Sequence, residues 1–410
     1  MARAARALSA SEPALPRIAV ISDVAVERTG AGSLLLYRLL KGYPTDRLWV
    51  FYNPGHASQT AGVRLPDVRY EPLEYRLPKL IRNRFNPFWP IAGSHHVRLH
   101  ARQVLRALGK FQPEAVLSVA NGFLWFTADA VAQKLQIPLH LFLHEDWPQL
   151  VTLSRSGRVQ DLVRAVARKR IEPIFRRAGA RFSVSPGMAD EVFQRYNVKT
   201  EVVYPSRGDD SATPLVRVRS LGSLPPTVAH AGFIHLKGNA ALLREMADIL
   251  RSLGGHLDLY TTHTDEDLAR FGLTPPVVRR IGFFPAKEFA ERVASTAHAL
   301  VLTASFNEED RAHEGTLFPS KLADYTAIGV PILVWGPPYS SAARWAAQNP
   351  GAALLFTDPS PEAVRSGVLS IVGSEERARS LAQGAVDAGK KFFELSSARE
   401  QLERALLRAG

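Results

Sequence analysis

Residues His313–Pro337 read HEGTLFPSKLADYTAIGVPILVWGP, a short helix followed directly by a buried strand. Ser320 follows a proline at the predicted start of the helix, where serine is a good N-cap, and Gly329 stands where helices commonly stop. Lys321 then lies in the first turn, near free backbone N–H groups and the positive end of the helix dipole. The apolar run after Gly329 is typical of a strand in a parallel sheet. The residues expected to face the sheet are Leu322, Tyr325 and Thr326.

The same alternation of apolar runs and helical patterns extends over the chain on both sides of this stretch. Strands are predicted at residues 17–23, 47–53, 114–120, 138–145, 180–185, 200–205, 227–233, 256–262, 277–284, 299–305, 331–336 and 351–358. Helices are predicted at residues 32–43, 95–111, 122–136, 158–178, 187–196, 239–253, 286–296 and 396–410. Several of the strands are apolar almost throughout, as strands buried on both faces of a parallel sheet are. This order predicts βαβ units and an α/β fold with doubly wound sheets.

Residues 206–227 interrupt the alternation with a stretch rich in Ser, Gly, Pro and charge, so they are the best candidate for a domain boundary. A chain of 410 residues also suits two domains. The predicted segments are a disordered tail at 1–16, a Rossmann-like domain at 17–206, a linker at 207–226, a second Rossmann-like domain at 227–390 and a C-terminal helix at 391–410. Two such sheets in tandem would bring their carboxyl-end loops, where α/β sheets bind ligands, face to face across a cleft.

Composition narrows the classes of partner and site. The sequence has no cysteine, which excludes disulfides, thiolate metal ligands and a cysteine nucleophile and fits a cytoplasmic location. Its net charge of +12 implies an anionic partner: a nucleic acid, an anionic membrane surface or a phosphorylated ligand. Because no helix-turn-helix, zinc-finger or RNP-type pattern is present, we expect no nucleic acid. No apolar run approaches the ~20 residues of a membrane span, and the basic start lacks the apolar core of a secretory signal.

A second lysine stands at a strand-to-helix turn, in the stretch HAGFIHLKGNAALL. The strand ends at Gly232, a short loop carries His235, and Lys237 opens the next helix. Two lysines at the carboxyl ends of one sheet favour binding of a diphosphate, and Asp324, on the same face as Lys321, suits the hydroxyls of a ribose. For the helix that carries Lys321 and Asp324, the alternative is an ordinary amphipathic helix with an i, i+3 ion pair.

These residues carry a resemblance to a known family. FPSKLADYTAIGVPIL, residues 318–333, resembles the C-terminal donor-site signature of glycosyltransferase family 4, and Lys237-Gly238 is similar to the family's phosphate loop. GAGSLLLYRLL, HEDWP, SVSPGMADEVFQRY and VVYPS are similar to its N-terminal segments. The resemblance implies the GT-B fold, with two Rossmann-like domains facing across a cleft. The first would take the acceptor and the second the nucleotide-sugar donor, and the C-terminal helices would cross back so that the last packs on the N-terminal domain.

The resemblance also implies roles for particular residues. Lys237 and Lys321 would contact the donor diphosphate, Asp324 would hold the ribose, and His144 would sit beside the sugar at the reaction centre. Two glycines of the first loop would let the backbone approach the donor phosphates. The expected catalytic residues are His144, Lys237 and Lys321, and the expected donor-binding residues are Gly30, Gly32, Gly232, His235, Lys237, Glu314, Thr316, Ser320, Lys321 and Asp324.

The chain departs from the family pattern at three points. Thr316 stands where the family has the first glutamate of a pair, and Glu314, two residues earlier, is a candidate substitute. The arginine that usually precedes the phosphate lysine is absent, and His235 is a candidate to replace it. HEDWP contains two extra residues, and its Glu145 and Asp146 would supply a base if the enzyme inverted configuration.

The resulting prediction is a metal-independent, retaining glycosyltransferase that needs no cofactor. Its donor would be a nucleotide diphosphate sugar and its acceptor a saccharide or a lipid-linked saccharide, in glycan or polysaccharide biosynthesis. Cations and helix N-termini aimed at the leaving diphosphate would stabilise its growing charge. A nucleotide-sugar epimerase of the same fold and a non-catalytic scaffold subunit that binds nucleotide sugar are the alternatives. The base and the sugar of the donor stay open.

Two acidic segments lie near the predicted donor site in the sequence. Asp265 and Asp267 match an Asp-any-Asp metal pattern, but their place at the start of a predicted helix favours solvated acids in its first turn. Residues 307–314, NEEDRAHE, directly precede the key helix. For them we expect a mobile loop over the donor or a plain solvated loop.

Residues 74–93, EYRLPKLIRNRFNPFWPIAG, interleave basic and aromatic side chains. That mixture suits an anionic bilayer surface with the rings at headgroup depth, and a second basic run, RAVARKRIEPIFRR, follows in the same domain. A surface loop that packs its aromatics on the domain is the alternative. The expected acceptor or membrane contacts are Lys79, Arg82, Arg84, Phe85, Phe88 and Trp89. They would place a cytoplasmic protein peripherally on the inner face of the cell membrane.

Overall fold

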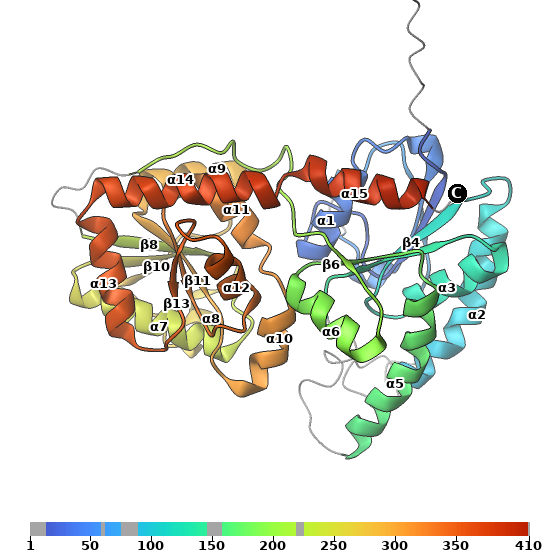
Figure 1. The fold of residues 1–410 in the computed structure, drawn as a ribbon, viewed down its shortest axis with the longest axis horizontal. Helices are drawn as coiled ribbons and strands as arrows, with labels where there is room; N and C mark the ends of the chain where they lie inside the picture. Colours follow the sequence, from blue (N-terminus) through green and yellow to red (C-terminus); the bar gives the residue numbers. More distant parts are fainter. Residues whose placement is uncertain (1–13, 59–61, 75–88, 146–157, 219–224, 409–410) are drawn as a thin grey trace, which may run out of the picture. The chain divides into compact units, whose positions relative to one another are not determined.

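The computed structural model describes residues 14–58, 62–74, 89–145, 158–218 and 225–408 (Figure 1). The chain divides into two compact units. One holds the described parts of residues 1–142, 157–181 and 399–410, and the other those of residues 143–156 and 182–398. Strands and helices alternate as the sequence predicts, but the strand Arg69–Pro72 and the helix Ser341–Gln348 were not among the predicted elements.

Within the described residues the first sheet has seven strands in the order β3-β2-β1-β4-β5-β6-β7. They are β1 (Ile18–Ser22), β2 (Leu48–Tyr52), β3 (Arg69–Pro72), β4 (Ala115–Val119), β5 (Leu139–Leu143), β6 (Ala180–Ser183) and β7 (Glu201–Val202). Strands β1, β2, β4 and β5 are buried over their whole length and pair in parallel. The strand order reverses at β1 and β4, which makes their carboxyl ends a topological switch point.

The helices of the first half of the chain connect these strands. They are α1 (Ala31–Leu40), α2 (Trp89–Leu108), α3 (Leu124–Leu135), α5 (Arg158–Arg177) and α6 (Pro186–Tyr196), with the short turns η1 (Thr45–Arg47) and η2 (Pro54–His56). Helix α3 packs on β1, β4 and α2. The last helix, α15 (Leu395–Leu407), is tied to α1, because the guanidinium of Arg399 donates to Arg38 O at 3.1 and 2.7 Å.

The second sheet has six described strands in the order β10-β9-β8-β11-β12-β13, and all five neighbouring pairs are parallel. The strands are β8 (Thr227–Ala231), β9 (His256–Tyr260), β10 (Val278–Arg280), β11 (Ala299–Thr303), β12 (Ile332–Trp335) and β13 (Leu354–Phe356). The helices are α7 (Lys237–Ser252), α8 (Asp265–Arg270), α9 (Ala286–Thr296), α10 (Arg311–Thr316), α11 (Lys321–Ile328), α12 (Ser341–Gln348), α13 (Pro361–Val372) and α14 (Glu375–Phe392), with the turn η3 (Glu308–Asp310). Its strand order reverses between β8 and β11.

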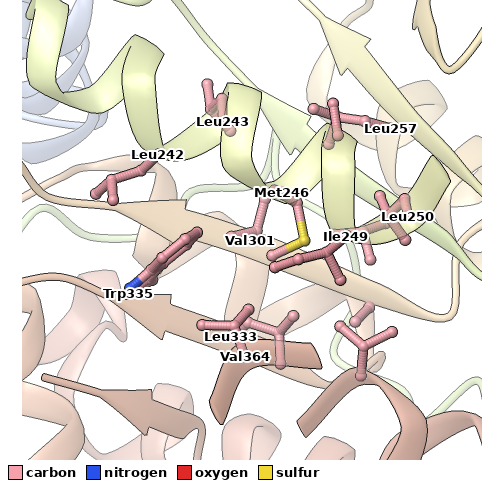
Figure 2. Packing of buried hydrophobic residues seen from close by; sticks show 14 of the residues in the cluster. Leu242, Leu243, Met246, Ile249, Leu250, Leu257, Val301, Leu333, Trp335 and Val364 are labelled. Atoms are coloured by element: carbon pink, nitrogen blue, oxygen red, sulfur yellow. The ribbon is translucent and has the colours of Figure 1, made fainter. Parts of the chain in front are cut away.

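Apolar side chains at helical spacing on α7 pack into the hydrophobic core of the second sheet. Figure 2 shows Met246 of α7 next to Val301 of β11, in a buried cluster that also holds Leu243, Leu250 and Val364 of α13. Figure 1 shows α9, α11 and α14 on the other side of the same strands. The strands are therefore covered on both faces, which explains why they read as continuous apolar runs. The two parallel sheets with interleaved helices confirm the predicted α/β fold.

Helix α11 begins at Lys321 and ends before Gly329, whose φ of +78° confirms the predicted stop. The prediction that the Ser320 side chain caps the helix is wrong. Its backbone is already helical, with φ −55°, and its hydroxyl makes no capping hydrogen bond, because a capping side chain requires an extended backbone at that position. The first turn is closed instead by the Leu322 N–H, which donates to Pro319 O at 2.9 Å.

Two of the residues expected to face the sheet differ in what they contact. Tyr325 is buried, and its hydroxyl oxygen accepts the Ala231 N–H at the end of β8 at 2.7 Å. Thr326 faces α14 rather than the sheet, since a Cβ at Gly389 would lie 2.3 Å from its Oγ1. The prediction for Thr326 is therefore wrong, because α11 is covered by a second helix.

Residues 307–314 form η3 and the start of α10, so the expectation of a loop there is wrong. The Ser305 hydroxyl donates to Asp310 Oδ2 at 2.6 Å. The acidic residues stand in the first turn, where the helix dipole favours negative charge. The segment therefore packs as a helix ahead of α11.

Replacing Gly329 by alanine should destabilise the protein by more than a positive φ alone costs. A Cβ there would lie 1.6 Å from Leu215 O, so residues 212–218 would have to move. We expect a loss of about 2–4 kcal/mol in the free energy of unfolding, measured by urea denaturation. Gly351→Ala is the matched control, because Gly351 has φ +88° with no atom within 4 Å of its Cβ position, and should cost only about 1 kcal/mol. Equal losses in the two variants would contradict the assigned contact.

Candidate functional site

The candidate site lies at the carboxyl ends of β8 and β11, where the strand order of the second sheet reverses. Ligands of open α/β sheets bind at such points because the chain leaves neighbouring strands in opposite directions and opens a crevice. The loop after β8 leads into α7, and the segment after β11 leads through α10 into α11. Groups from these two connections form the site.

Lys321, the first residue of α11, is partly buried beneath Gly232. A Cβ at Gly232 would lie 3.4 Å from both Cε and Nζ of the lysine, and Gly232 itself has φ +103°. Burial lowers the pKa of Lys321 to about 8, and the nearby Glu314 opposes that change. The lysine therefore presents a cation at a helix N-terminus, as predicted, but one that is poorly hydrated.

His230, in β8, is the nearest hydrogen-bonding partner of this lysine. Its Nε2 lies 3.4 Å from Lys321 Nζ and its Nδ1 lies 3.1 Å from Val301 O. Burial, and then the charge of Lys321, hold the pKa of His230 well below its usual range. Sequence reasoning missed this residue, because a histidine inside an apolar strand looks like part of the core.

Glu314, the candidate substitute for the missing glutamate, does reach the site. Its Oε1 accepts the Ser305 N–H at 2.9 Å, just beyond β11. Burial raises its pKa to about 7, while hydrogen bonds from Ser305 and Asn239 oppose that change. The structure thus brings Glu314 and Lys321 into one electrostatic cluster.

Thr316 does not take the place that a glutamate would have. Its Oγ1 donates to Ala312 O at 2.7 Å and the side chain is buried. Asp324 is also engaged, because its Oδ1 accepts the Ser211 hydroxyl at 3.2 Å. Ser320, next to Lys321, is partly buried.

The loop after β8 presents the second predicted lysine. Lys237 is exposed at the first residue of α7, and the following Gly238 packs against Ser305, whose Oγ would lie 1.8 Å from an added Cβ. His235 is exposed, and its pKa is lowered by desolvation and by Lys321 and His263. The ring of Phe233 is half exposed and stacks on His263 at 3.8 Å between centroids.

The first sheet holds the other predicted residues. Gly30 has φ +56° directly before α1, and Gly32 lies in its first turn. Asp23 lies at the switch point of the same sheet, and sequence reasoning missed it. Its Oδ2 accepts hydrogen bonds from the N–H groups of Phe123 and Leu124 at 2.6 and 2.7 Å. This buried carboxylate fixes the N-terminal end of α3 to β1.

His144 follows β5 at its carboxyl end and is buried. Burial lowers its pKa to about 4, so the ring is neutral at pH 7. Glu145 next to it is partly buried. Asp146 and the predicted acceptor or membrane contacts lie outside the described residues, except that Trp89 begins α2. Those outside are Lys79, Arg82, Arg84, Phe85 and Phe88.

The described residues contain no cluster of three or more His, Cys, Asp or Glu side chains that could hold a metal ion. Asp265, Glu266 and Asp267 form the first turn of α8, as expected, and Asp267 completes a capping box with Thr264. No helix among the described residues is long and apolar enough to cross a membrane.

Comparisons with known proteins identify the fold of this chain and a family model that matches part of it. The model for Glycosyltransferase Family 4 matches residues 57–206, and no curated protein sequence matches the chain. Sucrose-phosphate synthase from Thermosynechococcus elongatus is similar in structure, with a TM-score of 0.66 and 14% identity over 96% of this chain and 99% of that one.

Two further solved structures have the same fold. Anabaena HepE in complex with UDP and glucose has a TM-score of 0.62 and 14% identity, over 95% of this chain and 99% of its own. The lipopolysaccharide outer core galactosyltransferase WaaB has a TM-score of 0.63 and 15% identity, over 95% of this chain and 99% of its own. These likenesses show that the chain has the two-domain GT-B fold, and the glycosyltransferase family 4 model matches its residues 57–206.

Proposed function

We propose that the protein transfers a sugar from a nucleotide diphosphate sugar to a saccharide or lipid-linked acceptor, with retention of configuration and without a metal ion. The observation that carries this proposal is the Lys321 ammonium, partly buried at the N-terminus of α11 and at the switch point of the second sheet. Backbone N–H groups, the helix dipole and a poorly hydrated cation together favour a phosphate there. HepE, with the same fold, is seen with UDP and with UDP-glucose.

Catalysis would depend on the charge that develops on the leaving group. When the bond from the sugar carbon C1 to the diphosphate oxygen breaks, negative charge grows on that oxygen. Lys321 and Lys237 are then placed to stabilise it, and low hydration strengthens the contribution of Lys321. The acceptor hydroxyl oxygen bonds to C1 on the face that the diphosphate leaves, and its proton passes to a phosphate oxygen. No cofactor or metal takes part in this scheme.

The remaining predicted residues would bind the rest of the donor. Asp324 would exchange its hydrogen bond from Ser211 for hydrogen bonds from the ribose hydroxyls. Glu314 would contact the donor sugar, since it is the carboxylate whose charge acts on the pKa of Lys321. His144, Gly30 and the other predicted contacts of the first sheet stay predictions.

Incubation with a panel of nucleotide sugars and simple acceptor saccharides should release a free nucleotide diphosphate. EDTA should leave the rate unchanged, because cationic side chains rather than a metal would hold the phosphates. Proton NMR of the product should show the anomeric configuration of the donor. An epimerised donor would assign the chain to the epimerase alternative, and binding without turnover would assign it to the scaffold alternative.

Lys321→Ala should weaken binding of UDP, or of whichever nucleotide diphosphate binds, by about 1.5–3 kcal/mol, the value of a charge-assisted hydrogen bond. In the wild type the binding form is the ammonium, whose pKa is about 8, so affinity should be present below pH 8 and fall as the pH rises through it. Ionisation of Glu314, with a pKa of about 7, should add a smaller loss, which Glu314→Gln would remove. Calorimetry from about pH 6 to about pH 9 covers the titration of both groups and measures both effects.

The control for this change is Lys390→Ala, which removes an exposed lysine in the last turn of α14 and should bind as the wild type does. If Lys321→Ala binds as tightly as this control at pH 7, the assignment of the diphosphate site to α11 fails.

We also propose that residues 76–89 bring the first domain to an anionic membrane surface that holds a lipid-linked acceptor. The triple change Phe85→Ser, Phe88→Ser and Trp89→Ser should reduce binding to phosphatidylglycerol vesicles about tenfold or more. The reason is that three rings that would enter the bilayer surface are removed. Phe193→Ser is the matched control, because Phe193 is a half-exposed ring on α6 away from that segment in sequence. Equal retention of the triple variant and the wild type on the vesicles would end this proposal.

A further inference from the structure

We propose that His230 is a positioning residue of the donor site: its ring, held by the backbone of β11, keeps the ammonium of Lys321 at the mouth of α11. The inference rests on the proposed function only for its consequence, which is binding of the donor diphosphate. The contact itself is a property of the folded chain.

The buried position of His230 means that its ring nitrogens need hydrogen-bonding partners. The residue lies in β8 between Ala229 and Ala231, and its side chain is buried. A polar ring in such a place costs stability unless both nitrogens find partners. An apolar residue would fill the same volume without this requirement, so the hydrogen bonds of the ring are informative.

The two nitrogens of His230 have different partners, and one of them determines the tautomer. Val301 O can only accept a hydrogen bond, so the proton must lie on Nδ1, 3.1 Å from that oxygen. Nε2 is then left with its lone pair, 3.4 Å from Lys321 Nζ. An ammonium can only donate, so it donates to this lone pair. The chain of contacts runs from the β11 backbone through the imidazole to the lysine.

Charge supports the same arrangement. A protonated imidazolium at this distance would repel the ammonium, and burial keeps the pKa of His230 well below its usual range, so the ring is neutral. The titratable groups that influence Lys321 or feel its charge are His230 of β8, His235 of the following loop and Glu314 of α10. Of these, Glu314 attracts the ammonium, but its Oε1 already accepts the Ser305 N–H.

The lysine has little freedom to choose another position. Gly232 covers the lysine closely, because a Cβ added at Gly232 would lie only 3.4 Å from Lys321 Nζ. Tyr325 of the same helix ties α11 to the end of β8. With the backbone fixed in this way, the orientation of the last bonds of the lysine depends on its acceptor. His230 therefore acts through Lys321 rather than on the ligand.

A double-mutant cycle tests the coupling. His230→Phe keeps the ring and removes both nitrogens, and it should weaken UDP binding about tenfold by calorimetry, the effect of one misplaced charge-assisted contact. In a Lys321→Met background the same change should have no further effect, because there is no ammonium to position. His230→Gln, whose amide can donate to Val301 O and accept from the lysine, should restore most of the affinity.

His298→Phe is the matched control. His298 is also a buried histidine of this sheet, but it precedes β11 at the opposite, amino end, where its Nδ1 accepts the Thr227 N–H at 3.1 Å. This variant should lose stability on urea unfolding and keep the wild-type affinity for UDP. The proposal is overturned if His230→Phe lowers UDP affinity by the same factor in the wild type and in the Lys321→Met background. That result would show that His230 has a merely structural role.

A second measurement needs no ligand. Labelling of the Lys321 amine with acetic anhydride as a function of pH, read by mass spectrometry, gives its titration midpoint. Because a neutral acceptor stabilises the ammonium, the midpoint should fall in His230→Phe and stay near the wild-type value in His230→Gln. An unchanged midpoint in His230→Phe overturns the inference. If instead the midpoint falls but Lys321→Met binds UDP as the wild type does, the inference stands and the proposed donor site fails.

Discussion

The reversal of strand order between β8 and β11 is the constraint on which the candidate site depends. At this point the chain turns away in opposite directions above two adjacent strands, so the connections to α7 and α11 separate. Every group of the site comes from one of these two connections or from the ends of the two strands. Gly232 lets the first connection lie close over Lys321, and Tyr325 fixes the second to β8. The site is therefore built on the carboxyl end of the sheet and on the starts of the two helices that follow.

A poorly hydrated ammonium needs neighbours that stabilise it without neutralising it. A fully paired lysine would have no attraction left for an anion, and an isolated one would lose its proton. Lys321 lies between these limits, with a neutral imidazole as acceptor and Glu314, itself raised in pKa by burial, as a partial countercharge. A diphosphate that entered the site would supply the missing negative charge. Under the proposed function, this balance would let a helix N-terminus with one lysine bind an anion.

The family pattern and the structure differ most at the end of the proposed donor site that would hold the sugar. Thr316, at the position of the family's first glutamate, is buried against the backbone of its own helix. Glu314 reaches the cluster instead, because residues 307–314 form η3 and the start of α10 and so turn that side chain toward Ser305. In this chain the carboxylate that acts on the lysine therefore comes from position 314 rather than 316.

By itself, the sequence determined the two parallel sheets, the helices between them, the start of α11 at Lys321 and its stop at Gly329. These follow from periodicity and from backbone preference, which are local properties. Only the tertiary structure decided that His230 contacts Lys321 and that Asp23 binds the start of α3. It also decided that Ser320 does not cap its helix and that Thr326 faces α14. These outcomes depend on which strands are neighbours and which helix covers another. Residues far apart in sequence, such as His230 and Lys321, meet only because the sheet brings the end of β8 beside the start of α11.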